Sequence, residues 1–244
     1  MYKISCLLLV LMSVSAQAAE VRVAVAANFL STLKIIQPVY EQQSGNRLLI
    51  SSASTGKLFA QIKHGAPYDV LLSADQHYSQ QLETDDLVVQ GSRFVYAQGQ
   101  LVLWALDKMQ TIDETSLQQG AGRIALANPR IAPYGIAAQQ VMQRLGVFER
   151  LKGKLVQGES VGQAFQFTAT GNVSYGFVAL SQVLSSFNQY NRNSYWQIPE
   201  NLYSPLYQDA ALLKRAQTNG AARGFLAYLK TPQARDVMYA NGYL

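Results

Sequence analysis

The stretch Arg123–Gly135, R-I-A-L-A-N-P-R-I-A-P-Y-G, decides how the rest of the sequence is interpreted. Its first five residues are a short apolar run of strand type, and the segment after Gly135 carries apolar residues at helical spacing. Pro129 and Pro133 restrict the backbone between the two, so the loop 127–135 is stiff. A stiff loop that leads from a strand into a helix N-terminus can bind an anion. An ordinary connection shaped by its prolines is the alternative.

The residues before this loop alternate between strand-like and helix-like patterns. Three short segments with apolar centres are the expected strands, Val21–Ala26, Arg47–Ser52 and Asp69–Ser73, and each is followed by a segment with helical spacing. Such an alternation predicts a parallel sheet, whose loops after the strands meet at one edge. Two of these loops are polar, at Asn28 and at Ser54-Thr55. Asn28 is also placed to cap the helix that follows it.

A second alternation begins at Arg123. Its expected strands are Arg123–Ala127, Lys154–Gln157 and Val173–Val178, again with helices between them. The second half of the chain therefore repeats the architecture of the first half, although no internal sequence repeat is visible.

Three further strand-like segments connect the two units. Residues 94–96 and 101–106 lead out of the first unit, and Gln208–Leu213 leads back to it. The sequence thus predicts an α/β fold with two lobes, each a mostly parallel sheet flanked by helices, and a ligand cleft between the lobes. We place the first lobe at residues 19–98 plus 205–244 and the second at 99–204.

Residues 1–18 have the pattern of a secretory signal peptide. Lys3 precedes an almost wholly apolar run, Ile4–Val14, and the segment ends in an A-x-A pattern at Ala16–Ala18. The run is shorter than the roughly 20 residues that a transmembrane helix needs. We expect cleavage after Ala18 and an exported protein.

Cysteine content and charge exclude several classes of protein. Cys6 is the only cysteine and lies in the signal segment, so the mature chain has no disulfide, cysteine nucleophile or thiolate metal site. The formal net charge of the whole chain is +5, but its basic residues are scattered. The densest basic cluster, Arg150–Lys154, has the pattern of a solvated helix end. We therefore expect no nucleic-acid partner.

One catalytic motif occurs, at Gly158–Gly162. The residues G-E-S-V-G match the nucleophile elbow of α/β hydrolases and lie between an expected strand and an expected helix. In that fold the histidine follows the serine in the chain, whereas His64 and His77, the two histidines, both precede Ser160. A secreted serine hydrolase that uses Ser160 remains the alternative from a different functional class.

The segment Ser54–Lys57, S-T-G-K, looks like the end of a P-loop. Ser51 stands where that motif needs glycine, and Leu58 follows the lysine, so the segment is not a Walker A site. A small polar loop that opens a helix can still bind an oxyanion through hydroxyl and N–H groups. The sequence contains no carboxylate pair or His/Asp/Glu spacing typical of a metal or acid–base site.

The remaining candidate residues are neutral hydrogen-bond donors on these loops. They are Asn28, Ser54, Thr55, Tyr134 and the N–H groups near Val161. None of these positions carries Lys or Arg, and this pattern favours binding a fully ionised oxyanion over transforming it chemically. A site made only of donors also disfavours a protonated anion, whose hydrogen would find no acceptor.

Several stretches together resemble the periplasmic molybdate-binding proteins of bacterial ABC importers. The resemblance runs over nearly the whole mature sequence. It is carried by Val25–Phe29, Ala53–Ile62, Gly65–Asp75, Ala127–Ala138, Gly158–Gln163, Tyr175–Gln182, Phe225–Leu229 and Gly242-Tyr243.

The resemblance implies a type II periplasmic binding fold that closes over a tetrahedral molybdate or tungstate dianion. By position it implies ligand contacts from Ala27, Asn28, Ser54, Thr55, Tyr134 and Val161, with no residue bonded directly to a metal ion and no resident cofactor. This sequence departs from the family pattern in three places. Many members have serine at the position of Asn28 and at that of Thr55, and some have a tyrosine at the position of Ala179. Tyr134 is therefore the candidate for the phenolic donor.

The resemblance also implies how such a protein works. We expect a non-enzymatic, high-affinity receptor in the periplasm, monomeric, that delivers molybdate or tungstate to a membrane permease. A receptor for another oxyanion, such as sulfate, thiosulfate or phosphonate, remains an alternative, because molybdate and sulfate carry the same charge.

Overall fold

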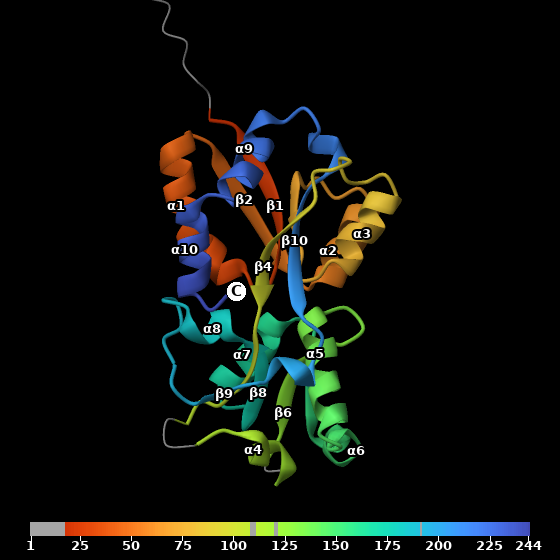
Figure 1. Cartoon of the computed structure of the whole chain (residues 1–244), viewed down its shortest axis with the longest axis vertical. Coiled ribbons are helices and arrows are strands. Elements are labelled where there is room, and N and C mark those ends of the chain that lie inside the picture. Colours follow the sequence, from red (N-terminus) through yellow and green to blue (C-terminus); the bar gives the residue numbers. More distant parts are fainter. Residues whose placement is uncertain (1–17, 108–110, 120–121, 191) are drawn as a thin grey trace, which may run out of the picture.

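The chain folds into two stacked lobes, each built around one five-stranded sheet (Figure 1). The structure, a computed structural model, describes residues 18–107, 111–119, 122–190 and 192–244. All but the last residue of the predicted signal peptide, including Cys6, lies outside the described residues. No helix in the described ranges is long and apolar enough to cross a membrane.

The elements alternate along the chain as strand and helix. The strands are β1 (Glu20–Ala26), β2 (Arg47–Ala53), β3 (Val70–Leu72), β4 (Phe94–Gly99), β5 (Leu101–Trp104), β6 (Ile124–Ala127), β7 (Leu155–Gly158), β8 (Tyr175–Ala179), β9 (Tyr195–Gln197) and β10 (Leu206–Leu212). The helices are α1 (Leu30–Ser44), α2 (Thr55–Lys63), α3 (His77–Thr84), α4 (Glu114–Gln118), α5 (Pro133–Arg144), α6 (Phe148–Leu151), α7 (Val161–Ala169), α8 (Leu180–Leu184), α9 (Gly220–Tyr228) and α10 (Pro232–Ala240).

The two sheets share one topology. The first has the order β2-β1-β3-β10-β4 and the second the order β7-β6-β8-β5-β9. In each sheet the first three strands are parallel, and the fourth is antiparallel to both of its neighbours. These sheets confirm the predicted α/β fold with two lobes.

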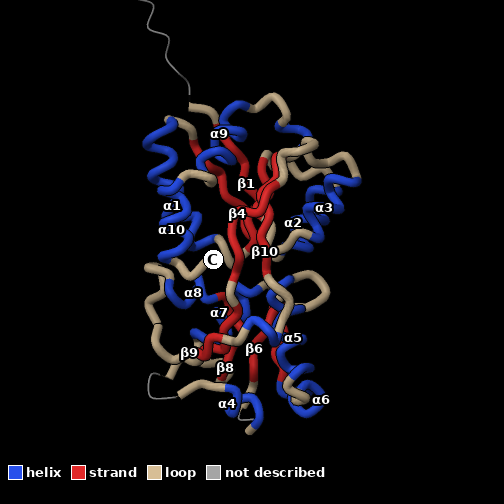
Figure 2. The backbone as a smooth tube through the Cα atoms, viewed as in Figure 1, coloured by secondary structure: helices blue, strands red, loops and turns tan. Residues whose placement is uncertain are grey.

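Helices cover both faces of each sheet, and the side chains of strand β1 show how the first sheet is buried between them (Figure 2). Val21, Val23 and Val25 point to the face covered by α1, α9 and α10, because they belong to one core cluster with side chains of those helices. Ala24 points to the opposite face and packs with Leu58 of α2 and Leu82 of α3. A strand buried on both faces needs apolar residues throughout, which explains the continuous run V-A-V-A.

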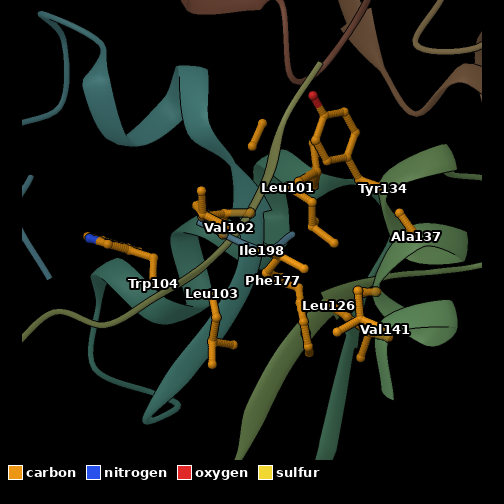
Figure 3. Close-up of a cluster of buried hydrophobic side chains, with 14 of the residues drawn as sticks. Leu101, Val102, Leu103, Trp104, Leu126, Tyr134, Ala137, Val141, Phe177 and Ile198 are labelled. Atoms are coloured by element: carbon orange, nitrogen blue, oxygen red, sulfur yellow. The ribbon is translucent and has the colours of Figure 1, made fainter. Parts of the chain in front are cut away.

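The core of the second lobe reaches the boundary between the lobes through Tyr134 (Figure 3). Its apolar side chains come from β5, β6 and β8 and from α5, and include Leu101, Phe177 and Val141. The tyrosine ring lies at the edge of this cluster, and its hydroxyl points away from the apolar side chains.

The chain passes between the sheets twice, after β4 and before β10. At the first passage, a Cβ on Gly99 would overlap the Tyr134 hydroxyl and the Gln208 Nε2. The absence of a side chain at Gly99 therefore allows a tyrosine of the second lobe to approach a glutamine of the first.

Local elements differ from the expectations at several points. The last residues of the predicted loop 127–135 belong to helix α5, which begins at Pro133, because proline is well tolerated in the first turn of a helix. Asn28 does not cap α1: the N-cap residue is Phe29, and no side chain caps this helix. The prediction of a cap was wrong because the Asn28 amide is engaged in tertiary hydrogen bonds. The short elements α4 and β9 were not predicted, since a single helical turn or three strand residues leave little periodicity in a sequence.

A buried ion pair anchors β10 within the first lobe. The Asp209 side chain has no solvent exposure and accepts hydrogen bonds from Arg93 Nη1 at 2.5 Å and from Ser79 Oγ at 2.8 Å. Arg93 also pairs with Glu83 at 3.1 Å. Breaking such a pair leaves a buried charge without compensation, which is more costly than losing a surface pair.

The substitution Arg93→Met should lower the free energy of unfolding by about 3 kcal/mol, because the Asp209 carboxylate stays buried without its cation. Urea unfolding of the ligand-free protein measures this change. Arg235→Met on α10 is the matched control, since Arg235 is exposed and has no ion pair among the described residues. It should change the free energy by less than about 0.5 kcal/mol. Equal losses in both variants would contradict this role of the buried pair.

Candidate functional site

Four helices begin around one small cavity between the lobes, two from each lobe. The helices are α1 and α2 of the first lobe and α5 and α7 of the second. The cavity is lined by Ala26, Ala27 and Asn28 before α1, Ser54 and Thr55 at α2, Ala74 after β3, Ala132, Pro133 and Tyr134 at α5, and Ser160 and Val161 at α7. All six predicted site residues line this cavity.

The electrostatics of the cavity favour an anion. The first N–H groups of each helix have no acceptor within the helix, and the helix dipole adds partial positive charge at the same end. Of the described residues that line the cavity, none is Asp, Glu, Lys, Arg or His. The cavity can therefore attract negative charge through dipoles, without a fixed cation.

The cavity is small in this arrangement of the lobes. Its volume is ≈ 10 Å³, about enough for one water-sized atom. Larger hollows lie elsewhere, including one of ≈ 400 Å³ that opens between the lobes beside Ala27 and Ser160. That hollow is large enough for a larger molecule, but the starts of only some of the four helices line it.

Two hydroxyls of the first lobe can donate into the cavity. Ser54 Oγ is buried and has no hydrogen-bond partner among the described residues. Thr55 Oγ1 accepts the main-chain N–H of Ala74 at 3.1 Å, which leaves the hydroxyl hydrogen of Thr55 available. Both side chains therefore have a hydrogen for an acceptor in the cavity.

Tyr134 supplies a hydroxyl from the second lobe. Its oxygen accepts a hydrogen bond from Gln208 Nε2 at 3.4 Å. Burial raises the pKa of the Tyr134 phenol well above its usual value, since ionisation would place a charge in a nearly dry environment. The phenol therefore keeps its hydrogen at neutral pH. Val161, at the first position of α7, contributes its main-chain N–H to the same cavity.

The amide of Asn28 is engaged behind the cavity. Its Nδ2 donates to Gln208 Oε1 at 2.9 Å and to Tyr243 Oη at 3.1 Å, so both amide hydrogens are used. Its Oδ1 is buried without a partner among the described residues. In this arrangement the Asn28 main-chain N–H, rather than its side-chain amide, is available to the cavity, whereas the Ala27 N–H donates to the Ala53 main-chain oxygen at 3.0 Å.

Three residues of this region were missed from the sequence: Gln208, Tyr243 and Ser181. Gln208 contacts Asn28 and Tyr134, while Ser181 Oγ donates to the Asn28 main-chain oxygen at 2.9 Å and Tyr243 Oη lies 2.9 Å from the same oxygen. The signal for Gln208 was a polar pair, Gln208-Asp209, at the start of an expected buried strand. Ser181 and Tyr243 lie in stretches that carry the family resemblance, but no local pattern marked them as part of a site.

Contacts between the lobes hold the cavity closed. The Gly56 N–H donates to the Ile131 main-chain oxygen at 2.9 Å, and Tyr78 Oη donates to the Arg130 oxygen at 3.4 Å. At the rim, Lys57 and Glu159 form an exposed ion pair at 2.5 Å. The structure therefore represents the closed arrangement of the two lobes.

Ser160 caps a helix in this structure. Its Oγ accepts the Gln163 N–H at 3.3 Å, as the N-cap residue of α7. Among the described residues, no hydrogen bond joins Ser160 to a histidine: His64 lies at the C-terminal end of α2 and His77 begins α3. The described residues also contain no cluster of three or more potential metal ligands.

Comparisons with known proteins agree with this geometry. A family described as "bacterial extracellular solute-binding protein" matches residues 21–244. A molybdate-binding protein ModA of Azotobacter vinelandii is 45% identical over 96% of this chain and 93% of its own length. The Rhodobacter capsulatus molybdate-binding protein ModA is 41% identical over 96% of this chain and 91% of its own. The solved periplasmic molybdate-binding protein of Azotobacter vinelandii superposes with a TM-score of 0.87 at 38% identity, covering 92% of this chain and 98% of that one.

The fold and the site define a two-lobed solute-binding protein of the type II periplasmic class, with its ligand cavity between the lobes. The chain belongs to the family of bacterial extracellular solute-binding proteins, together with these molybdate-binding relatives.

The substitution Gly56→Ala should hinder closure of the lobes. A Cβ at residue 56 would lie 2.9 Å from the Ile131 main chain, which belongs to the second lobe and must move away. It would also lie 2.9 Å from Tyr78 Oη, the tip of a side chain of the first lobe that can shift. Small-angle X-ray scattering with saturating molybdate should give a larger radius of gyration for this variant than for the wild type.

The control is Gly224→Ala on α9, where the nearest atom to the added Cβ lies 3.9 Å away. Both substitutions favour the helix by up to about 1 kcal/mol, so neither should lower the melting temperature of the ligand-free protein. Unchanged compaction in Gly56→Ala would show that the contact does not limit closure.

Proposed function

We propose that this protein binds molybdate and tungstate with high affinity in the cavity between its lobes. The observation that carries the proposal is the convergence of four helix N-termini and three hydroxyls, those of Ser54, Thr55 and Tyr134, on one uncharged cavity. The similarity to molybdate-binding proteins along nearly the whole chain supports this choice of ligand.

The proposed contacts come from both lobes. Ala27, Asn28, Ser54 and Thr55 contribute from the first lobe, and Tyr134 and Val161 from the second. A hydrogen bond to a charged group contributes roughly 1.5–3 kcal/mol, so several such bonds are enough for tight binding after the costs of association. Since molybdate and sulfate have equal charge, discrimination between them rests on cavity size and the placement of the donors.

We further propose that the protein works in the periplasm as a monomer and delivers its ligand to the membrane permease of an ABC importer. Residues 1–18 would be removed on export, and residues 19–98 plus 205–244 and 99–204 would move as the two lobes. Closure would present a surface formed by both lobes, including the Lys57–Glu159 pair at the rim, that a permease can distinguish from the open form.

We also propose that the protein has no catalytic role and no resident cofactor. The hydrolase alternative would need a base for Ser160, and the hydroxyl of this residue is bonded to the main chain of its own helix. An ester hydrolysis assay on the wild type and on Ser160→Ala separates the two classes, because activity lost in the variant would favour the hydrolase.

A ligand panel tests the proposed specificity. Molybdate and tungstate should raise the melting temperature strongly, since a ligand at 100 times its Kd adds about 2.7 kcal/mol to the free energy of unfolding. Sulfate, thiosulfate and phosphate at the same concentration should cause little change. Equal shifts with sulfate would overturn the specificity for molybdate, while leaving an oxyanion receptor.

The substitution Tyr134→Phe should weaken molybdate binding by about 10- to 100-fold, because it removes one hydrogen bond to the dianion and preserves the packed ring. Isothermal titration calorimetry measures the change. Tyr40→Phe is the matched control: its buried hydroxyl donates to the Ala221 oxygen at 3.1 Å, within the first lobe and outside the cavity lining. Unchanged affinity in Tyr134→Phe would remove Tyr134 from the site.

A further inference from the structure

The buried amide of Gln208 lies behind the cavity and not in its lining. The pairing of β10 with β4 shifts its register at this point: Gln208 lies opposite Ala97 and Asp209 opposite Val95, so that Tyr96 is the extra residue of a bulge. Gln208 and Asp209 are both fully buried, like most of β10. The bulge is a local irregularity that accompanies the contact of Gln208 with the second lobe.

The oxygen end of the Gln208 amide is fully occupied. Oε1 accepts from Asn28 Nδ2 at 2.9 Å and from Tyr96 Oη at 2.9 Å. An amide oxygen has two lone pairs, so these two donors satisfy it. The nitrogen end is then turned toward Tyr134, with 3.4 Å between Nε2 and the phenolic oxygen.

The direction of these hydrogen bonds follows from Tyr243, which contacts the Asn28 amide on the side away from Gln208. The single hydroxyl hydrogen of Tyr243 has two possible acceptors. They are the Asn28 main-chain oxygen at 2.9 Å and Ser181 Oγ at 3.1 Å. The Tyr243 oxygen therefore accepts from Asn28 Nδ2. This orients the Asn28 amide, which in turn presents a hydrogen to Gln208 Oε1.

We propose that Gln208 is a positioning residue for oxyanion binding. By donating to the Tyr134 oxygen, it leaves the single hydroxyl hydrogen of Tyr134 free to point into the cavity, toward the ligand. The inference rests on the proposed function, and it concerns how the site makes the phenol a donor. Gln208 does not touch the ligand; it acts through Tyr134.

The reverse orientation of the amides makes the opposite prediction. If both the Asn28 and Gln208 amides were turned by 180°, Gln208 Oε1 would face Tyr134. The Tyr134 hydroxyl would then donate its hydrogen to Gln208, and that hydrogen would be unavailable to the ligand. Removing Gln208 would then release that hydrogen and tighten binding. The sign of the effect on affinity thus distinguishes the two orientations.

A double-mutant cycle with Gln208→Met and Tyr134→Phe tests the proposal, with the Kd of molybdate as the readout. Met nearly conserves the volume of Gln. We expect Gln208→Met to raise Kd about fivefold or more in the wild-type background. In the Tyr134→Phe background it should raise Kd less than about twofold, because residues that act through one another are not additive. Gln37→Met on α1, outside the cavity lining, should leave Kd unchanged.

Each outcome of the cycle decides the proposal. The same penalty in both backgrounds would give Gln208 only a structural role, and tighter binding in Gln208→Met would reverse the orientation; either result overturns the proposal. A wild type that does not bind molybdate overturns the proposed function itself. If Gln208→Met fails to fold, Gln208→Glu replaces it in the cycle, because the carboxylate still accepts from Asn28 and Tyr96. The increase in the Kd of molybdate caused by Gln208→Glu should then be smaller in the Tyr134→Phe background than in the wild type.

Discussion

The structure depends on one constraint: the N-termini of four helices, two from each lobe, meet at one uncharged cavity. Each helix start carries N–H groups without intrahelical acceptors, and closing the lobes removes them from water. Buried donors without acceptors are costly, so closure is favoured when an anion supplies the acceptors. The ligand contributes to the interface between the lobes, which is why binding and closure are coupled. The shared strand order of the two sheets places the helix starts symmetrically for this purpose.

Close approach between the lobes imposes further requirements on the sequence. Gly56 lies against the Ile131 main chain, and Gly99 lies where a side chain would separate Tyr134 from Gln208. Behind the cavity, Tyr243, Asn28, Gln208 and Tyr134 form one hydrogen-bonded series that includes residues of both lobes. Rigid backbone contacts thus limit how far the lobes close, and the polar series orients the donors that the closed cavity presents.

Local sequence patterns predicted the scaffold well, because alternating segments such as Val21–Ala26 and Arg123–Ala127 carry their burial in their own composition. The loops after these strands also indicated the cavity residues. Gln208 and Tyr243 could not be predicted in the same way, since their partners lie 74 and 215 residues away and no local pattern links them. Asn28 shows the same limit of local patterns. Its position favoured a helix cap, but in the structure its side chain forms hydrogen bonds to residues distant in the sequence instead.

The central claim is that a dianion is bound by donors of both lobes in the cavity between them. Anomalous X-ray scattering from a crystal grown with tungstate tests it most directly, because the tungsten position is found independently of the protein. The proposed function predicts one strong peak in the cavity, with ligand oxygens within hydrogen-bond distance of Tyr134 Oη and the Val161 N–H. A peak in the larger hollow beside Phe165 and Asn188, or none between the lobes, would contradict it.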